Sequence, residues 1–413
     1  MSTRFFVQTV VALAVLFFHP IVVSARAYSL TVAGERLEFV AQLERGYVVK
    51  VAESAGGIHV LAGISAPDTE DATPVGGLDR RGVWVVENDG MAEQNEETIR
   101  SFRAGGRVIY AAPLFSSNGE TVAIIPEIVL RMKSDVQMEE VQTLCEMAGC
   151  TIRKRMEFTT QEYLLEVLGP DAEAVFAAVE QLGEAPEVEW ACPNTAFRPE
   201  LYGQPSSAVT VPQEQMQIAS EAGDLDSESV FPNDEYFPMQ WHLHNTGQSG
   251  GTPDADINAP EAWDISTGDP NVIIAIFDNG VDSNHPDLHA NVVAGYDFYD
   301  DDDSPEPELD DWTNWHGTAC AGLAAARGDN SIGVVGVAWN CKIMPIRRHR
   351  RSGEQGADGI TIAEHATAFR WAAENGADIL SNSWGRTYAL PILHSAIVDI
   401  TKPGGSAATA EAA

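Results

Sequence analysis

An acid and an imidazole that could share a proton stand at the ends of two elements in the C-terminal half of the chain. Residues 272–277 form a continuous apolar run, typical of a strand buried on both faces of a parallel sheet, and Asp278 follows it directly. His316 opens a stretch of small apolar residues over 319–326, which predicts a helix. A buried Asp that accepts a hydrogen bond from imidazole Nδ1 fixes the ring tautomer and stabilises the imidazolium that forms when Nε2 takes a proton. The pair could therefore be half of a nucleophilic triad, although either residue alone more often caps a turn or starts a helix.

Three motifs, taken together, favour the triad. They are Asp-Asn-Gly-Val at 278–281 followed by His-Pro-Asp-Leu at 285–288, then His-Gly-Thr-Ala-Cys-Ala-Gly at 316–322, and Ser-Asn-Ser-Trp-Gly at 381–385. This succession resembles the subtilisin-like (subtilase) serine proteases, with some kexin-like features. The resemblance covers residues 233 to about 403 and implies a serine-type endopeptidase that hydrolyses peptide bonds in protein or peptide substrates. By the same resemblance, Asp278 is the orienting acid and His316 is the general base.

The resemblance also implies a substrate strand and a structural calcium site. Backbone groups of Ser383, Trp384 and Gly385 would hydrogen-bond an extended peptide, although this segment alone would pass for an ordinary strand end. Calcium prefers six to eight oxygen ligands. The implied ligands are side chains of three residues and carbonyls near three others: Asp234, Asp287, Asn330, Arg327, Ile332 and Val334. An acidic loop that includes Asp297, Asp302 and Glu306 could hold a second ion or simply be solvated.

The C-terminal end of the sequence departs from the family pattern. Beyond Gly385, the family continues to an oxyanion Asn and then to a Gly-Thr-Ser turn that carries the nucleophile. The sequence reaches only Ala413, and Ser406 lies in a low-complexity tail with no strands before it, so we do not expect Ser406 to be the nucleophile. We expect the chain to be inactive as it stands, because loss of the nucleophile alone costs about as much as loss of the whole triad.

Two further departures concern specificity and thiol chemistry. In the kexin-like enzymes, an acidic residue shortly after Trp-Gly receives a basic side chain of the substrate. Arg386 and its neighbours stand at this place here, so a preference for basic residues in the substrate is not expected. The basic run at 347–351 could line the substrate groove, but a solvated position is the preferred interpretation. Cys320 follows His316 by one helical turn and is expected to be a free thiol, with a disulfide to Cys341 as the weaker alternative.

Periodicity indicates how the rest of the chain is organised. Residues 126–198 alternate as strand, helix, two strands, helix and strand, which is a β-α-β-β-α-β unit that looks like the family's inhibitory propeptide. The fold class is therefore α/β, with an incomplete parallel-sheet catalytic domain preceded by an α+β propeptide and a β-rich region. The expected divisions are a signal peptide at 1–27, a β-rich pro-region at 28–125, the propeptide-like domain at 126–198, an acidic linker at 199–231 and the peptidase part at 232–413.

Charge and the N-terminus restrict the partners and the location. The chain has 61 acidic and 25 basic residues, a formal charge of −36, which disfavours nucleic acid and anionic lipid surfaces as partners. Arg4 followed by an apolar stretch to Val23 is typical of an export signal, with an uncleaved membrane anchor as the alternative. We expect a secreted protein without stable membrane association after signal cleavage, whose partners are its substrate and its own propeptide. A propeptide-type protease inhibitor or non-catalytic binding protein is the second hypothesis, and a calcium-binding module is the third.

Overall fold

The computed structural model describes most of the chain from residue 27 onward. The described residues are 27–33, 35–51, 72–74, 83–87, 92–104, 108–117, 120–134, 136–159, 161–197, 200–201, 231–248, 250–308, 312–349, 359–385 and 391–402. The expected signal peptide lies outside them except for its last residue, and so does most of the expected linker at 199–231. Within the described ranges, no helix combines the length and the apolar character needed to span a bilayer.

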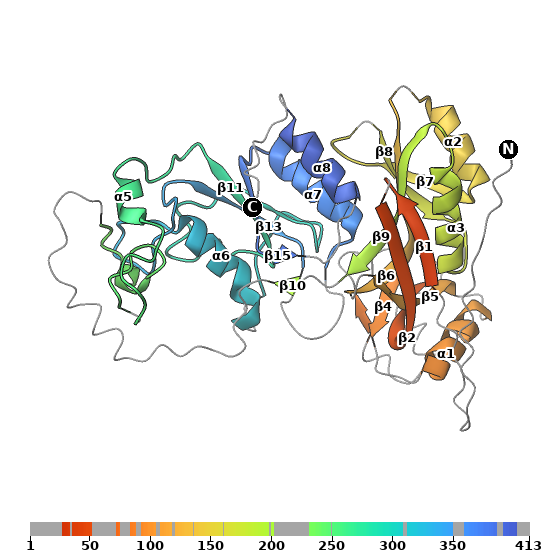
Figure 1. Ribbon diagram of the computed structural model, residues 1–413, viewed down its shortest axis with the longest axis horizontal. Helices are drawn as coiled ribbons and strands as arrows, with labels where there is room; N and C mark the ends of the chain where they lie inside the picture. The colour runs from red at the N-terminus through yellow and green to blue at the C-terminus, as the bar shows by residue number, and fades with distance from the viewer. Residues whose placement is uncertain are drawn as a thin grey trace.

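An antiparallel sheet of nine strands makes up the N-terminal part of the described chain (Figure 1). Its longest path has the order β3-β4-β2-β5-β6-β8-β7, with β1 beside β2 and β9 beside β6. The strands are β1 (Ala27–Val32), β2 (Glu35–Val51), β3 (Ala72–Pro74), β4 (Val83–Glu87), β5 (Val108–Ser117), β6 (Glu120–Met132), β7 (Cys150–Arg155), β8 (Glu162–Val167) and β9 (Val188–Phe197). The expected boundary between residues 125 and 126 therefore falls inside β6, and the two stretches share one sheet.

Helices α2 (Met138–Met147) and α3 (Ala172–Gly183) complete the expected β-α-β-β-α-β order from β6 to β9. Asp171 begins α3 by accepting a hydrogen bond from the backbone N–H of Ala174, and Val175, Phe176 and Val179 on one face of this helix are buried. A further helix, α1 (Ala92–Ala104), lies in the stretch expected to be β-rich, and its Ile99 and Phe102 are buried.

The C-terminal part is built on a parallel sheet, as the sequence predicts. Its order is β12-β13-β11-β14, from β11 (Ile273–Asp278), β12 (Tyr296–Asp297), β13 (Lys342–Arg347) and β14 (Ile379–Asn382). The other elements are the 3-10 turns η6 (Phe237–Met239) and η7 (Trp312–Trp315), the helices α5 (Ala259–Trp263), α6 (His316–Ala325), α7 (Ile362–Glu374) and α8 (Pro391–Thr401), and two short strands, β10 (Glu200–Leu201) and β15 (Trp384–Gly385).

The residues of β11 before Asp278 are all apolar, which agrees with the coverage of both faces of this strand. Ile274 and Ile276 belong to a core with residues of α6, whereas Ala275 and Phe277 belong to the core that contains α7. The rings of Phe277 and Phe369 meet edge to face with centroids 4.9 Å apart. This packing fixes the strand whose last residue is Asp278.

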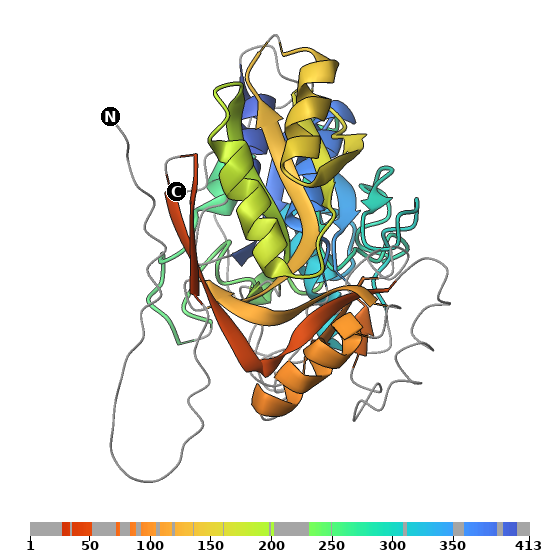
Figure 2. The same ribbon diagram turned by 90° about the vertical axis from the view of Figure 1, so that its right-hand side faces the viewer.

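Helices α7 and α8 lie between the two sheets, against the face of the N-terminal sheet opposite to α2 and α3 (Figures 1 and 2). Buried side chains of the N-terminal sheet, of α7 and of α8 form one continuous apolar cluster. The two parts of the chain therefore share a hydrophobic core.

Truncating Phe277 tests the packing of β11. Because Phe277 is 1 % exposed, we expect Phe277→Ala to lower the free energy of unfolding by about 3–5 kcal/mol, measured by denaturant titration. Leu323→Ala on α6 is the control: Leu323 is 51 % exposed, and its loss should change stability by about 0.5 kcal/mol or less. Equal effects of the two substitutions would contradict this packing of β11.

Candidate active site

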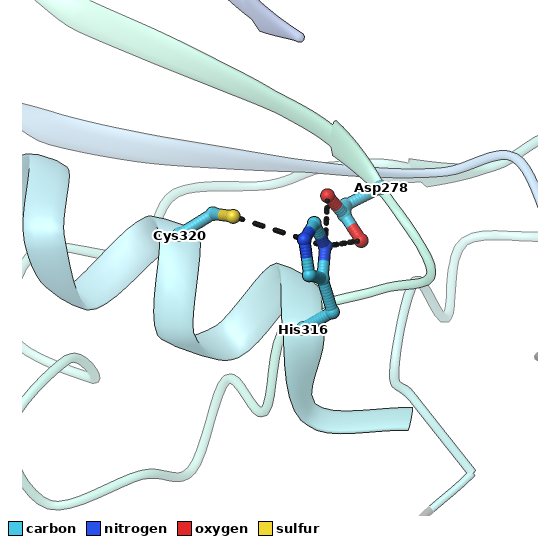
Figure 3. A group of neighbouring side chains, drawn as sticks. All are labelled: Asp278, His316 and Cys320. Atoms are coloured by element: carbon cyan, nitrogen blue, oxygen red, sulfur yellow. Dashed lines mark hydrogen bonds and ion pairs between the residues drawn. The ribbon is translucent and has the colours of Figure 1, made fainter. Parts of the chain in front are cut away.

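The structure brings Asp278 and His316 together at the carboxyl end of β11. His316 Nδ1 lies 2.8 Å from each carboxylate oxygen of Asp278, so the ring faces the carboxylate (Figure 3). The side chains of Asp278 and His316 are 1 % and 8 % exposed. This hydrogen bond joins two side chains that are almost inaccessible to solvent. It holds the ring with Nδ1 toward the carboxylate and Nε2 away from it.

Asn279 ties the two elements of this pair to each other. Its backbone N–H donates to Asp278 Oδ1 at 2.9 Å, and its side-chain oxygen accepts from the backbone N–H of Gly317, also at 2.9 Å. The hydroxyl of Thr318 accepts from the backbone N–H of Asp282 at 3.0 Å. The start of α6 is therefore bonded to the turn that follows β11.

The close approach of α6 to β11 requires glycine at position 317. A Cβ there would lie 2.2 Å from the carbonyl oxygen of Gly280 and 2.8 Å from Asp278 Cβ. Gly280 itself has a φ of +104°, which favours glycine. The His-Gly and Asp-Asn-Gly motifs thus have steric reasons beyond their chemistry.

Cys320 is the third group of the cluster. Its Sγ lies 3.8 Å from His316 Nδ1, and the ligand-type atoms of Asp278, His316 and Cys320 lie within 4.8 Å of one another (Figure 3). Cys320 and Cys341 are both free thiols, so the alternative of a disulfide between them was wrong. Burial raises the pKa of Cys145 to about 12 and that of Cys150 to about 11, so both remain thiols at neutral pH.

The segment expected to bind substrate is already paired with a strand of the same chain. Leu201 of β10 lies opposite Trp384, and Glu200 lies opposite Gly385, in an antiparallel pair. Ser383 is half-buried and lies between β14 and β15. The backbone at 384–385 can therefore accept an extended peptide as an added strand.

The basic run after β13 is buried where it is described, so the preference for a solvated position was wrong for residues 347–349. Arg347, Arg348 and His349 are 5 %, 0 % and 1 % exposed. The Arg348 guanidinium lies 4.1 Å from the centroid of the Trp384 ring, and its Nη1 lies 2.7 Å from His365 Nε2. Burial, and then the neighbouring charge of Arg348, hold the pKa of His349 well below its usual value, so this ring is neutral. Residues 350 and 351 lie outside the described ranges.

Two buried carboxylates, Asp234 and Asp287, make the expected calcium site chemically reasonable. Asp234 Oδ1 is buried without a hydrogen-bond donor, and burial, with the charge of Asp287 added, raises the pKa of Asp234. Asn330 Nδ2 and the backbone N–H of Val334 donate to the two oxygens of Asp287 at 2.9 and 2.8 Å.

The loop that carries the remaining expected ligands surrounds this carboxylate pair. The backbone N–H of Arg327 donates to the Asp287 carbonyl at 2.9 Å, and that of Ile332 donates to Asn330 Oδ1 at 2.8 Å. The expected ligands Asp234, Asp287 and Asn330 offer oxygen atoms of the type that a hard divalent cation prefers, and Asp234 Oδ1 has no hydrogen-bond donor of its own.

The second cation site is less well supported. Arg347 Nη1 donates to Asp297 Oδ2 at 2.6 Å, and the other oxygen of Asp297 accepts backbone N–H groups of Tyr299 and Asp300. Glu306 accepts from the backbone N–H of Ser283 at 3.1 Å. A guanidinium already occupies the place beside Asp297 that a metal ion would take.

The site and the sheet together define a class of protein. An Asp–His pair at the carboxyl edge of a parallel sheet has the geometry that the acid and base of a nucleophilic hydrolase require. Residues 269–412 match the sequence profile described as "Subtilase family", so this part of the chain is similar to the subtilisin-like serine peptidases.

Two named relatives match part of this chain. Neuroendocrine convertase 2 of Drosophila melanogaster is 52 % identical over 119 residues, which are 28 % of this chain and 18 % of that protein. Neuroendocrine convertase 2 of Mus musculus is 46 % identical over 127 residues, which are 30 % and 20 % of the two chains. The present chain thus matches about a fifth of the length of these relatives.

Solved structures show weaker likeness. Fervidolysin from Fervidobacterium pennivorans, described as a keratinolytic enzyme related to subtilisin, aligns with a TM-score of 0.47 and 21 % identity over 66 % of this chain and 37 % of its own. The Aeromonas sobria serine protease, solved with its chaperone, aligns with a TM-score of 0.37 and 22 % identity over 46 % and 34 %.

The sequence did not reveal two features around this site. The pairing of β10 with β15 joins residues far apart in the chain, and two residues carry too little pattern to predict a strand. The burial of residues 347–349 was missed because charged side chains are rarely buried. Their position directly after a buried strand was the available signal.

Adding one methyl group at Gly317 tests the close approach between α6 and β11. We expect Gly317→Ala to lower the free energy of unfolding by about 1–3 kcal/mol, because the new Cβ meets backbone atoms that cannot move alone. The matched control is Gly322→Ala in the same helix, where the new Cβ finds only Val334 Cγ2 at 3.9 Å. That control should gain up to about 1 kcal/mol from helix propensity, and a loss at position 322 but not at 317 would contradict the geometry.

Proposed function

We propose that this chain is part of the precursor of a secreted subtilisin-like serine endopeptidase that cleaves peptide bonds in protein substrates. The observation that carries the proposal is the hydrogen-bond distance of 2.8 Å between the buried Asp278 carboxylate and His316 Nδ1. Proteins similar to this chain over 119 and 127 residues are named convertases. The natural substrate proteins are not specified by these residues.

His316 would act as the general base and then as the general acid. With Nδ1–H donated to Asp278, Nε2 would take the proton of a serine hydroxyl as its oxygen attacks the substrate carbonyl carbon. The imidazolium that forms gains stability from the adjacent carboxylate. The same proton then passes to the leaving amine, which completes acyl transfer and leaves the ring neutral for the attack of water.

The nucleophile and the oxyanion donor belong, in our proposal, to polypeptide outside these 413 residues. The match to about a fifth of the relatives' length agrees with this division. One oxyanion donor is worth about a hundredfold to a thousandfold in rate, and the attacking serine is worth more. The 413-residue chain by itself should therefore be inactive.

The N-terminal unit would inhibit the site by covering the substrate strand. The antiparallel pairing of β10 with Trp384 and Gly385 supports this role, because the segment after β9 then holds the same backbone groups that a substrate needs. Export through the signal at 1–27 would deliver such an inhibited precursor.

A role as a protease inhibitor in trans remains the second candidate, and the same β10 pairing favours it. The two candidate functions are distinguished by mixing the 413-residue chain with an active subtilase from another source and measuring inhibition of that enzyme. Inhibition with a Kd in the nanomolar range would favour the inhibitor, whereas no inhibition would leave only the precursor.

A calcium ion would be held by the side chains of Asp234, Asp287 and Asn330 together with carbonyls of the loop at 327–334. It would neutralise two buried carboxylates and so rigidify the loop, and it takes no part in proton transfer. Asp287 and Asn330 remain fixed by their own hydrogen bond at 2.9 Å.

The role of His316 can be measured on a chain completed with a subtilase C-terminal segment. We expect His316→Ala to reduce kcat/KM for peptide hydrolysis by about 10⁴-fold or more, because the base is lost. The matched control is His394→Ala, an exposed histidine on α8, which should leave the rate unchanged. Equal rates for His316→Ala and the completed parent would remove His316 from the mechanism.

Calcium binding predicts a change in thermal stability. Addition of Ca²⁺ to the metal-free 413-residue chain should raise its Tm, because a ligand that binds only the folded state stabilises it by mass action. In Asp287→Asn the shift should be lost, whereas Asp254→Asn, at an exposed position, should retain it. A shift that survives in Asp287→Asn would exclude this loop as the binding site.

A further inference from the structure

Four charged side chains and one serine meet where the N-terminal sheet packs on α7 and α8. Arg131 of β6 and Glu162 of β8 come from the N-terminal sheet, whereas Arg370 comes from α7 and Ser395 and Asp399 come from α8. We call these five residues the seam network. Each side of the seam supplies one cation and one carboxylate.

Glu162 is the centre of the seam network. Arg370 donates to both of its oxygens, Nη1 to Oε2 at 2.8 Å and Nη2 to Oε1 at 3.0 Å. Arg131 Nη1 and the Ser395 hydroxyl also donate to Oε1, at 2.8 and 2.9 Å. A carboxylate that accepts a two-pronged guanidinium bond has a defined position and a defined orientation.

Asp399 closes the network on the outer side. It accepts from Arg131 at 3.1 Å and from Arg370 at 3.0 Å. Burial opposes ionisation of this carboxyl, but hydrogen bonds from Arg131 and Lys402 outweigh it and lower its pKa, so Asp399 is a carboxylate at neutral pH. The two cations and two anions therefore alternate across the seam.

Burial makes the central pair costly to separate. The side chains of Arg370 and Glu162 are 1 % and 0 % exposed, whereas those of Arg131 and Asp399 are 17 % and 21 % exposed. A cavity of about 570 Å³ whose lining includes Arg131 and Asp399 gives water access to the outer pair. Loss of one partner of the inner pair would leave this group of two cations and two anions with one unbalanced charge.

Apolar packing and the network do different things at this seam. The shared core, with Phe369, Ile392 and Ala396 on the helix side, stabilises any apolar surface of the right shape. It discriminates poorly between such surfaces, because apolar contact has no direction. A buried guanidinium disfavours binding of any surface that has no carboxylate at the matching position, because the charge would then be buried without this partner.

We propose that the seam network determines which N-terminal unit the α7–α8 face accepts. The accepted partner is a β-α-β-β-α-β unit with a carboxylate at the position of Glu162 and a guanidinium at the position of Arg131, as in this chain. A unit that lacks this carboxylate buries Arg370 beside Asp399 alone. The inference concerns recognition between two parts of the chain and does not depend on peptidase activity.

The test measures how fast the N-terminal unit leaves after the connection is cut. A specific protease site inserted between residues 202 and 230 of the full chain is cleaved after folding, and release of the N-terminal piece is followed by size-exclusion chromatography over time. Glu162→Gln should accelerate release roughly a hundredfold or more, since it breaks a buried pair from one side. Glu189→Gln is the matched control. Glu189 accepts from Arg131 Nε at 3.1 Å but is 51 % exposed, so its substitution should change the rate by about threefold or less.

Two further variants separate recognition from general damage. Glu162→Gln combined with Arg370→Gln removes both charges and should release more slowly than Glu162→Gln alone, because the charges that remain at the seam, those of Arg131 and Asp399, are then balanced. Asp399→Asn, at the partly solvent-exposed side of the network, should accelerate release roughly tenfold. If Glu162→Gln does not fold, the release rate of Asp399→Asn tests the proposal in its place. Release from folded Glu162→Gln at the rate of Glu189→Gln would overturn the proposal, and so would an Asp399→Asn rate within about threefold of the parent.

Discussion

The hydrogen bond between Asp278 and His316 is the interaction on which the site depends. It forms only because β11 ends at the acid and α6 begins at the base, at a distance that excludes any side chain at position 317. Packing on both faces of β11 holds the acid in place, and Asn279 bonds the two turns together. The chemistry of the pair thus rests on backbone geometry and core packing rather than on the two residues alone.

The N-terminal sheet is part of the same physical system. It shares a hydrophobic core with α7 and α8, it faces them through a buried network of alternating charges, and β10, which follows its last strand, pairs with the backbone at 384–385. Apolar packing, charge pairing and backbone pairing therefore all connect the N-terminal unit to the C-terminal part of the chain. Because these contacts differ in kind, each can be weakened without the others.

Much of this architecture could be predicted from the sequence where local pattern is strong. The apolar run at 272–277 became β11 within one residue, the β-α-β-β-α-β order from β6 to β9 was as expected, and the motif residues Asp278 and His316 lie in contact. Helix α1 was missed because the whole stretch at 28–125 was predicted to be β-rich, although Ile99 and Phe102 have the three-residue spacing of one helix face. The partners of Arg348 and Glu162 could not be predicted, because Trp384 and Arg370 are distant from them in sequence. Such partners become visible only once the fold is known.

The protonation of the His316 ring tests the central pair most directly. Nitrogen-15 NMR of the histidines in the 413-residue chain distinguishes a ring protonated at Nδ1 from one protonated at Nε2. We predict a neutral His316 with its proton on Nδ1, in a low-field hydrogen-bonded resonance that disappears in Asp278→Ala. A His316 ring with its proton on Nε2, unaffected by Asp278→Ala, would contradict this arrangement of acid and base.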